Sequence, residues 1–347
     1  MDQTLLNIAF WFGIYAIVSI SLNLDYGLAG IPNFGKALSV LFGAFTVGGI
    51  VNRIFIAFYG IEGELIESSA ELKTILNQRI SEDPVFGISI LFLCLFLSAV
   101  IGAVVGALAI LPSARLSRDY LAITLLAISE VSFMVFNYNT SLGGGYYGIS
   151  VPDVFAFYKG DRQLLFTMIS LLTLLFIYFT AERISNSPFG RLLRAMREDE
   201  DVVKAYGRNL MILRIKISSI SSAIAAIAGA IFSLFTANFI ASNFTRVDWT
   251  FYPFLIVLLG GAGNNRGVLL GTLLFVTVKQ LLMVYKHEIV EILRIPFETV
   301  WMEYISFGLL MILVLFYKPE GLIKEKPVYK AVRKLRGVKN GESSNSN

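Results

Sequence analysis

The chain has 347 residues, of which 56% are hydrophobic and only 16% are charged, with a formal net charge of +4. Apolar stretches of about 18 residues or more recur along it, which excludes an ordinary soluble fold. Because the sequence contains one Cys and one His, it has neither an internal disulfide nor a Cys- or His-rich metal site, and no metal or cofactor is expected.

The first apolar stretch, 5–24, lacks a basic leader and a small-residue cleavage site, so we interpret it as a retained membrane helix. The stretch "GIPNFGK", residues 30–36, follows it and resembles a phosphate-binding loop. However, Ala37 stands where such a loop needs a Ser or Thr hydroxyl to hold Mg²⁺. A bilayer-length helix also precedes it, where a nucleotide loop would follow a buried strand. The stretch therefore predicts a helix break made by Gly and Pro.

Nine apolar elements can be read along the chain. The seventh is short and could form a half-helix, and the start of the second element could also form one. They are 5–24, 37–60, 85–111, 119–137, 164–181, 217–240, 249–262, 266–286 and 300–317. We predict an all-α, polytopic transmembrane helical bundle with broken or re-entrant helices. Lys279 is expected near the end of its span, where its ammonium reaches the interface.

The charges in the connections predict the orientation. Segment 182–216 carries eight Lys or Arg residues, and 318–347 carries another eight, whereas 62–84 carries six acids and two basic residues. The positive-inside rule places the basic segments and the carboxyl terminus in the cytoplasm. We therefore expect a transmembrane domain over 1–323, with 62–84 as an extracytoplasmic insertion. Residues 324–347 are expected to form a basic, disordered cytoplasmic tail that contacts anionic membrane lipid.

One basic segment predicts an amphipathic surface helix over 187–207. Ser187 is a good N-cap, Pro188 suits the first helical position, and Gly207 suits a left-handed end. Apolar residues share one side of this helix of about five turns: Phe189, Leu192, Leu193, Met196, Val203 and Tyr206. The helix could rest on lipid headgroups, or its mixed charges could suit a groove on another protein. These residues alone leave both interpretations open.

Polar residues within or beside the spans are candidates for a translocation pathway. Asn23 and Asp25 flank the first break, and Asn33 and Lys36 lie in it, where irregular backbone with unpaired N–H and C=O groups could line a cavity. Glu130 and Asn137 lie in the fourth apolar element. Glu130 either faces the pathway or pairs with a Lys or Arg of a neighbouring span, and both alternatives stay open.

Several stretches resemble the LivM-like permease subunits of branched-chain amino acid importers of the ATP-binding-cassette type. They include "SLNLDYGLAGIPNFGKALSVLFGAF", "DYLAITLLAISEVSFMVFNYNTSLGGGYYGI", "SPFGRLLRAMREDEDVVKAYGRNLMILRIK", "LLGGAGNNRGVLLGTLL" and "YKPEGL". The resemblance covers about residues 5–323. This chain departs from it at Lys36, where the family commonly has His, and in 62–84, which looks like an enlarged outer loop.

The resemblance implies a transport subunit and not an enzyme. It implies alternating-access transport of a hydrophobic amino acid across the cell membrane, with a LivH-like second permease, two ATPase subunits and an extracytoplasmic binding protein as partners. No nucleic acid is expected. The segment 187–207 would couple to the ATPases, and the matching positions are Gly190, Arg191, Ala195, Arg197, Glu198 and Gly207. The alternatives are a urea, short-amide or sugar permease of the same architecture, an ion-coupled carrier and, last, a membrane-bound enzyme.

Overall fold

The computed structural model describes residues 3–112, 116–293, 299–318 and 320–325. Within these residues, seven helical stretches are long and apolar enough to cross a membrane. They are Gln3–Leu28, Lys36–Tyr59, Pro84–Ile110, Arg118–Tyr138, Arg162–Asn186, Leu210–Thr236 and Asn265–Tyr285. The chain is therefore an all-helical, multi-pass membrane protein, as predicted.

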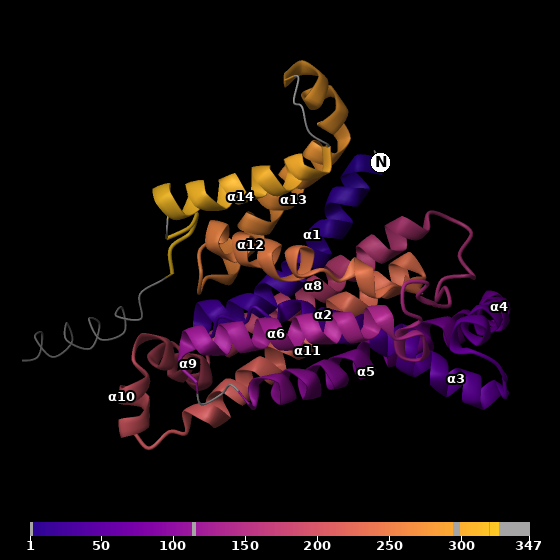
Figure 1. Cartoon of the computed structure of the whole chain (residues 1–347), viewed down its shortest axis with the longest axis horizontal. Helices are drawn as coiled ribbons and strands as arrows, with labels where there is room; N and C mark the ends of the chain where they lie inside the picture. Colours follow the sequence, from indigo (N-terminus) through magenta and orange to yellow (C-terminus); the bar gives the residue numbers. More distant parts are fainter. Residues whose placement is uncertain (1–2, 113–115, 294–298, 319, 326–347) are drawn as a thin grey trace, which may run out of the picture.

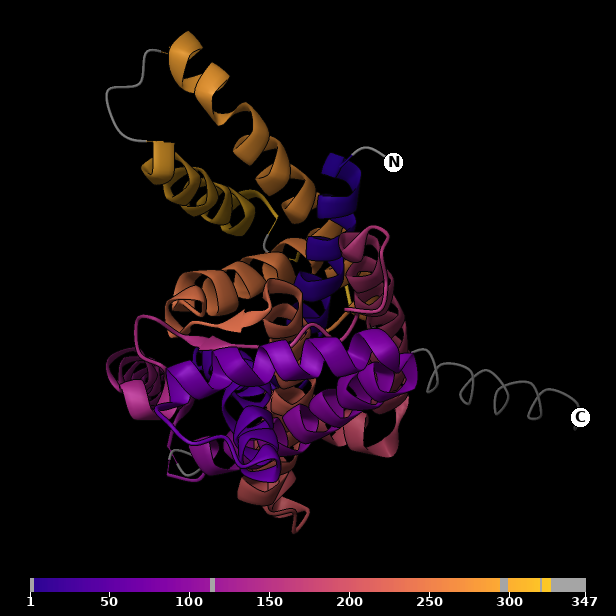
Figure 2. The ribbon, with the colours of Figure 1, turned by 90° about the vertical axis from the view of Figure 1, so that its right-hand side faces the viewer.

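The bundle has two recognisable ends. Its long helices are α1 (Gln3–Leu22), α5 (Pro84–Ile110), α6 (Arg118–Tyr138), α8 (Arg162–Asn186), α11 (Leu210–Thr236), α13 (Asn265–Leu293) and α14 (Thr299–Tyr317). Helices α9 (Pro188–Glu198) and α10 (Glu200–Ala205) lie at one end of the longest axis, and α3 (Asn52–Tyr59) and α4 (Leu65–Glu82) lie at the other (Figure 1). We refer to these as the α9 end and the α4 end. Helices α13 and α14 project from the rest of the bundle (Figures 1 and 2).

The predicted broken helices are present. Helix α1 continues into a π-helical turn, η1 (Asn23–Leu28), and the chain then turns at Gly30, whose φ is +70°. Helix α2 (Lys36–Phe45) follows and reaches α3 through a second π-helical turn, η2 (Thr46–Val51). A left-handed φ is unfavourable for residues with a Cβ, so Gly30 permits the reversal between α1 and α2.

The expected count of nine apolar elements exceeds the seven span-length helices of the described chain. Each expected element coincides with a helix among the described residues, and one of these helices is too short to span a membrane. Element 249–262 is the nine-residue α12 (Tyr252–Gly260), preceded by the π-helical turn η4 (Val247–Phe251), which confirms the short half-helix. Element 300–317 corresponds to the 19-residue α14, and among the residues whose side chains the structure describes its apolar stretch is Tyr304–Val314.

Close backbone contacts join α2, α5 and α11 in the core. A methyl group added at Gly43 of α2 would collide with the backbone of Ala226 in α11, and one at Gly229 of α11 would collide with the backbone of Val40. On α5, a methyl group at Gly102 would collide with the Ala226 side chain. Small residues at such contacts let helices approach closely in a membrane, where no hydrophobic force distinguishes helix from lipid. These three helices therefore form a tightly packed unit.

The α4 end is covered by short elements. Helix α4 is amphipathic and buries Leu72, Leu76 and Ile80, so the acidic insertion packs on the bundle as a surface helix. Near it lie α7 (Thr140–Gly143), the 3₁₀ turn η3 (Ala241–Asn243) and a two-stranded antiparallel ribbon of β1 (Ile149–Ser150) and β2 (Asn238–Phe239). In the ribbon Ile149 pairs with Phe239. At the other extreme, residues 326–347 of the predicted tail lie outside the described residues.

The prediction of one continuous helix over 187–207 was wrong, because the segment is two helices that meet at Asp199. Asp199 has an extended backbone (φ −151°, ψ 115°), and its carboxylate accepts hydrogen bonds from the amides of Asp201 and Val202. Asp is a strong N-cap residue, and acidic side chains are unfavourable at a helix carboxyl terminus. The acidic run therefore ends α9 and starts α10.

Candidate functional site

A tight corner between α8 and α9 positions the surface segment. The Ser187 hydroxyl accepts a hydrogen bond from the amide of Gly190 at 3.1 Å, which confirms the predicted N-cap. Any side chain at Gly190 would collide with the carbonyl oxygens of Ile184 and Ser185. The corner thus requires glycine at this position, and α9 leaves α8 without a flexible linker.

Helix α9 turns one face into the protein and one outward. Leu193 and Met196 are buried, whereas Arg191 and Glu198 are exposed and Ala195 is half-buried between them. The predicted apolar side holds for α9 but not for all of α10, since Tyr206 is 82% exposed. The break at Asp199 changes the direction of the helix, so the single helical periodicity does not continue past it.

Arg197 links α9 to the broken end of α1. Its guanidinium donates to the carbonyl oxygen of Gly27 in η1, and its Nη2 lies 2.6 Å from Oε2 of Glu325. Arg194, one turn earlier, places Nε 3.0 Å from the other oxygen of the same carboxylate. Glu325 therefore bridges two arginines of α9, and the carboxyl-terminal segment is clamped onto the surface helix.

A chain of amides continues this connection from α1 to α8. Asn23 accepts from the amide of Gly263, in the turn between α12 and α13, at 2.8 Å and donates to Oδ1 of Asn265 at 2.9 Å. Asn265 in turn donates to Oε2 of Glu182 on α8 at 3.1 Å. Asn23, predicted as a pathway residue, is 2% exposed and lies within this network. We call this set of contacts, together with Arg194, Arg197 and Glu325, the coupling junction.

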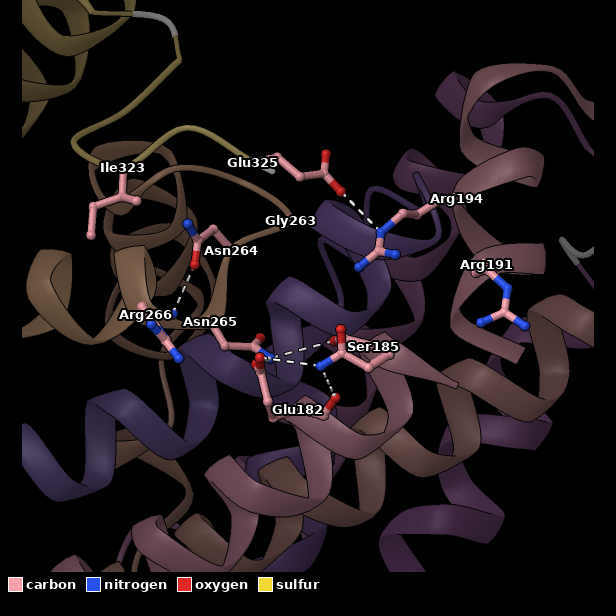
Figure 3. A pocket seen from close by; sticks show the side chains of 11 residues that line it. Glu182, Ser185, Arg191, Arg194, Gly263, Asn264, Asn265, Arg266, Ile323 and Glu325 are labelled. Carbon is pink, nitrogen blue, oxygen red and sulfur yellow. Dashed lines mark hydrogen bonds and ion pairs between the residues drawn. The ribbon is translucent and has the colours of Figure 1, made fainter. Parts of the chain in front are cut away.

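The coupling junction borders a polar recess of about 460 Å³. Figure 3 shows residues of α8, α9, the α12–α13 turn and the carboxyl-terminal segment converging on it. Both signs of charge line it, from Glu182 and Glu325 and from Arg191, Arg194 and Arg266. Four segments that are distant in sequence thus meet around one polar recess.

Two other arginines hold the break between α9 and α10. Arg118, at the start of α6, donates to the carbonyl oxygens of Met196 and Arg197, which end α9. Arg214 of α11 places Nη2 2.6 Å from Oε1 of Glu200, the first residue of α10. The surface segment is therefore attached at its break to both α6 and α11, by charge-assisted contacts that are among the stronger hydrogen bonds in proteins.

The outer face of α10 carries an exposed ion pair between Asp201 and Lys204, 2.8 Å apart. The hydrogen bond with Lys204, reinforced by its charge, lowers the pKa of Asp201, and the same contact raises the pKa of Lys204. Gly207 follows with φ +71°, which is the left-handed conformation expected at the end of this segment.

Lys36 and Asn33 share a buried carboxylate at the first break. Oδ2 of Asp25 accepts from Nδ2 of Asn33 at 2.9 Å and from Nζ of Lys36 at 3.0 Å, and it also accepts from the hydroxyl of Ser221 on α11. Asp25 and Lys36 are both 0% exposed. The other oxygen, Oδ1, has no hydrogen-bond partner among the described residues. The break therefore holds an ion pair inside the membrane-spanning region, and we call it the break cluster.

Glu130 and Asn137, the other predicted pathway residues, lie on α6. Oε2 of Glu130 is 3.5 Å from Nη1 of Arg246, and both side chains are partly exposed. Glu130 therefore does pair with a basic residue, but Arg246 lies just before η4 and not in a neighbouring span, so the choice between pairing and pathway stays a prediction. Asn137 is 5% exposed, and its Oδ1 has no hydrogen-bond partner among the described residues. A role of either residue in a pathway stays a prediction.

Two residues that hold the coupling junction and the break cluster together were not identified from the sequence. Glu325 was assigned to a disordered tail, and its only signal was an acidic residue within a basic stretch. Asp25 flanked the predicted break but was not among the expected pathway residues, although its carboxylate organises Asn33 and Lys36. The contacts of Glu325 with Arg194 and Arg197, and of Asp25 with Ser221, join residues far apart in the sequence, which local patterns do not report.

Comparisons with known proteins agree with this architecture. Residues 4–315 match the protein family described as "Branched-chain amino acid transport system / permease component". A Methanocaldococcus jannaschii protein described as "Probable branched-chain amino acid transport permease protein LivM" is 56% identical over 322 residues, which cover 92% of this chain and 93% of the relative.

More distant relatives occur in Salmonella typhimurium and Escherichia coli, both described as "High-affinity branched-chain amino acid transport system permease protein LivM". Each is 25% identical over 357 residues, covering 95% of this chain and 72% of the relative. No solved structure matches the chain. The family match over most of the residues and the high identity to the first relative show that this chain belongs to the LivM-like branched-chain amino acid transport permeases.

Proposed function

We propose that this chain is a permease subunit of an ATP-binding-cassette importer that moves branched-chain or other hydrophobic amino acids inward by alternating access. The observation that carries the proposal is the coupling junction, which connects a surface helix to the broken end of α1, the α12–α13 turn and α8. Family membership supports the substrate class, because the relatives are described as branched-chain amino acid permeases.

In this proposal the α9 end faces the cytoplasm and α9–α10 is the segment on which the ATPase subunits act. The exposed side chains of Arg191 and Glu198, with Tyr206, form the surface that an ATPase groove would grip. Movement of α9 would be transmitted through Arg197 to Gly27, so that the break after α1 moves with it. The basic connections at this end support the orientation through the positive-inside rule.

The remaining partners follow from the same arrangement. Two ATPase subunits would bind two permease subunits, this chain and a LivH-like second permease. An extracytoplasmic binding protein would deliver the amino acid at the α4 end, where α4 presents exposed acidic residues such as Glu67 and Glu71. ATP would be hydrolysed on the partner subunits, and this chain would supply the pathway and the mechanical connection. The break cluster, at the connection between the first two span-length helices, is the proposed moving part of that pathway.

The test is purification from native membranes followed by reconstitution. We expect ATPase subunits to accompany the chain, and the reconstituted complex to take up leucine only when ATP is present. Arg197→Ala should reduce uptake per ATP hydrolysed, and Glu198→Ala should weaken ATPase association, while Lys159→Ala, at an exposed position distant in sequence, should do neither. Uptake driven by an ion gradient without ATP would refute the proposal, and ATP-driven uptake of urea instead of leucine would refute the substrate class.

A further inference from the structure

A second recess, of about 500 Å³, lies in the membrane-spanning region between α1, η4 and α13. None of its lining residues belongs to the coupling junction or the break cluster. The side chains that matter here project from three elements: Asn7, Trp11 and Tyr15 from α1, Asp248 and Trp249 from η4, and Lys279 from α13. Asn7, Trp11 and Tyr15 are four residues apart, so they share one face of α1.

The walls of this recess are aromatic. The rings of Trp11 and Tyr15 stack with centroids 5.5 Å apart, and those of Tyr15 and Trp249 stack at 6.0 Å. Phe232 of α11 closes the wall, 5.3 Å from Trp249 and 5.6 Å from Trp11. Small-molecule sites are typically cavities of about 300–1,000 Å³. This recess falls within that size range, and its lining mixes aromatic side chains with polar and charged ones.

One side of the recess carries opposite charges. Nζ of Lys279 lies 3.4 Å from Oδ1 of Asp248 and 3.3 Å from the Tyr15 hydroxyl, and 4.3 Å from the centre of the Tyr252 ring. The first two distances exceed the usual range of about 2.7–3.2 Å for such bonds. The other oxygen of Asp248 accepts from the Thr245 hydroxyl at 2.7 Å, which fixes the carboxylate. The ammonium of Lys279 and the carboxylate of Asp248 thus stand side by side at one wall of the recess.

The recess lies at a depth in the membrane where a substrate entering from the α4 end could reach it. Lys279 was expected to reach the interface near the end of its span, but it is 8% exposed and buried within the bundle. It follows Asn265 by 14 residues of α13, which corresponds to about 21 Å along the helix. That distance is past the middle of a hydrocarbon core of about 30 Å, towards the α4 end. Charged groups at such depth are costly and usually serve substrates or ions.

The geometry points to a binding subsite for a zwitterionic amino acid with an aliphatic side chain. Lys279 binds the α-carboxylate, Asp248 binds the α-ammonium, and Trp11, Tyr15 and Trp249 contact the side chain. This inference rests on the proposed function and adds the place where the chain holds its substrate. A lipid phosphate is disfavoured because the Asp248 carboxylate would repel it, whereas a zwitterion satisfies both charges.

Binding of tritiated leucine to the full chain in lipid nanodiscs tests the subsite. The two competitors are 4-methylpentanoate, which lacks the amine, and 3-methylbutylamine, which lacks the carboxylate. Lys279→Gln should weaken leucine and 4-methylpentanoate binding by about tenfold or more and leave 3-methylbutylamine nearly unchanged. Asp248→Asn should produce the opposite pattern for the two competitors. Lys279→Arg should retain binding, and the exposed-site variant Lys159→Gln should match the wild type.

If a charge variant fails to fold, the wild-type chain still decides the question. Leucine should bind more tightly than either competitor, and in a Trp301→Phe background it should change the emission of Trp11 and Trp249, the two remaining tryptophans. Equal binding of leucine by the wild type and both charge variants would overturn the subsite, as would binding of dihexanoyl phosphatidylglycerol by a chain that binds no leucine.

ATP-driven leucine uptake by the reconstituted complex separates this inference from the proposed function. Normal uptake in both Lys279→Gln and Asp248→Asn complexes would remove the subsite and leave the importer intact. Leucine binding with the expected dependence on both charges, but without ATP-driven uptake in the wild-type complex, would retain the subsite and refute the importer.

Discussion

Removing one charge of the break cluster should destabilise the protein far more than removing both. Lys36 and Asp25 are 3.0 Å apart and fully buried. At that separation and an effective dielectric constant of about 20, their attraction is about 5–6 kcal/mol, which offsets a desolvation cost of several kcal/mol for each ion. We therefore expect Lys36→Met to lower the free energy of unfolding by about 3–5 kcal/mol, because it leaves the Asp25 carboxylate buried without its cation.

The measurement is a double-mutant cycle of unfolding in mixed detergent micelles. Asp25→Asn alone should also destabilise the chain, whereas the double variant Asp25→Asn/Lys36→Met should recover most of the loss, since no unpaired charge remains. Lys159→Met, at an exposed position, is the control and should change little. If either single variant is as stable as the wild type, or if the double variant loses the sum of the two single losses, the ion pair has no such role.

Three further predictions concern packing, the clamp and the α6 ion pair. Gly43→Ala should destabilise the chain by about 1–3 kcal/mol, because its methyl group meets the α11 backbone, whereas Gly308→Ala has open space and should be neutral; thermal unfolding compares the two. Glu325→Gln should accelerate amide exchange in α9 and lower uptake, while Glu320→Gln, in an exposed local pair, should do neither. Glu130→Gln should cost less than about 1 kcal/mol, because its ion pair is partly exposed; lost uptake at unchanged stability would instead assign Glu130 to the pathway.

The spans and breaks were predictable because lipid makes hydrophobicity a strong signal. Every apolar element coincides with helix, and the Gly and Pro residues at 30–32 do interrupt the chain after α1. The short seventh element was visible from its length alone. Hydropathy does not distinguish an apolar element that crosses the membrane fully from a half-helix. Helix α12 is such a case, because it has only nine residues beyond its π-helical turn.

The site was predictable only where its determinants are local. The Ser187 cap and the left-handed Gly207 could be read from neighbouring residues. The break at Asp199 could not be read in this way, because an acidic run also fits the exposed side of a continuous helix. The same Asp can either cap a new helix or continue the existing one, and the local sequence does not decide between them. Glu325 is 128 residues from Arg197 in sequence, and Asp25 is 196 residues from Ser221, so neither contact leaves a local pattern.

The clamp formed by Glu325 has a practical consequence for handling the protein. An affinity tag fused directly after residue 323, or a proteolytic cut there, would delete the carboxylate that neutralises Arg194 and Arg197. Preparations shortened in this way would show weakened attachment of α9 and could be mistaken for naturally inactive permease. Tags placed beyond residue 347 would leave that carboxylate in place.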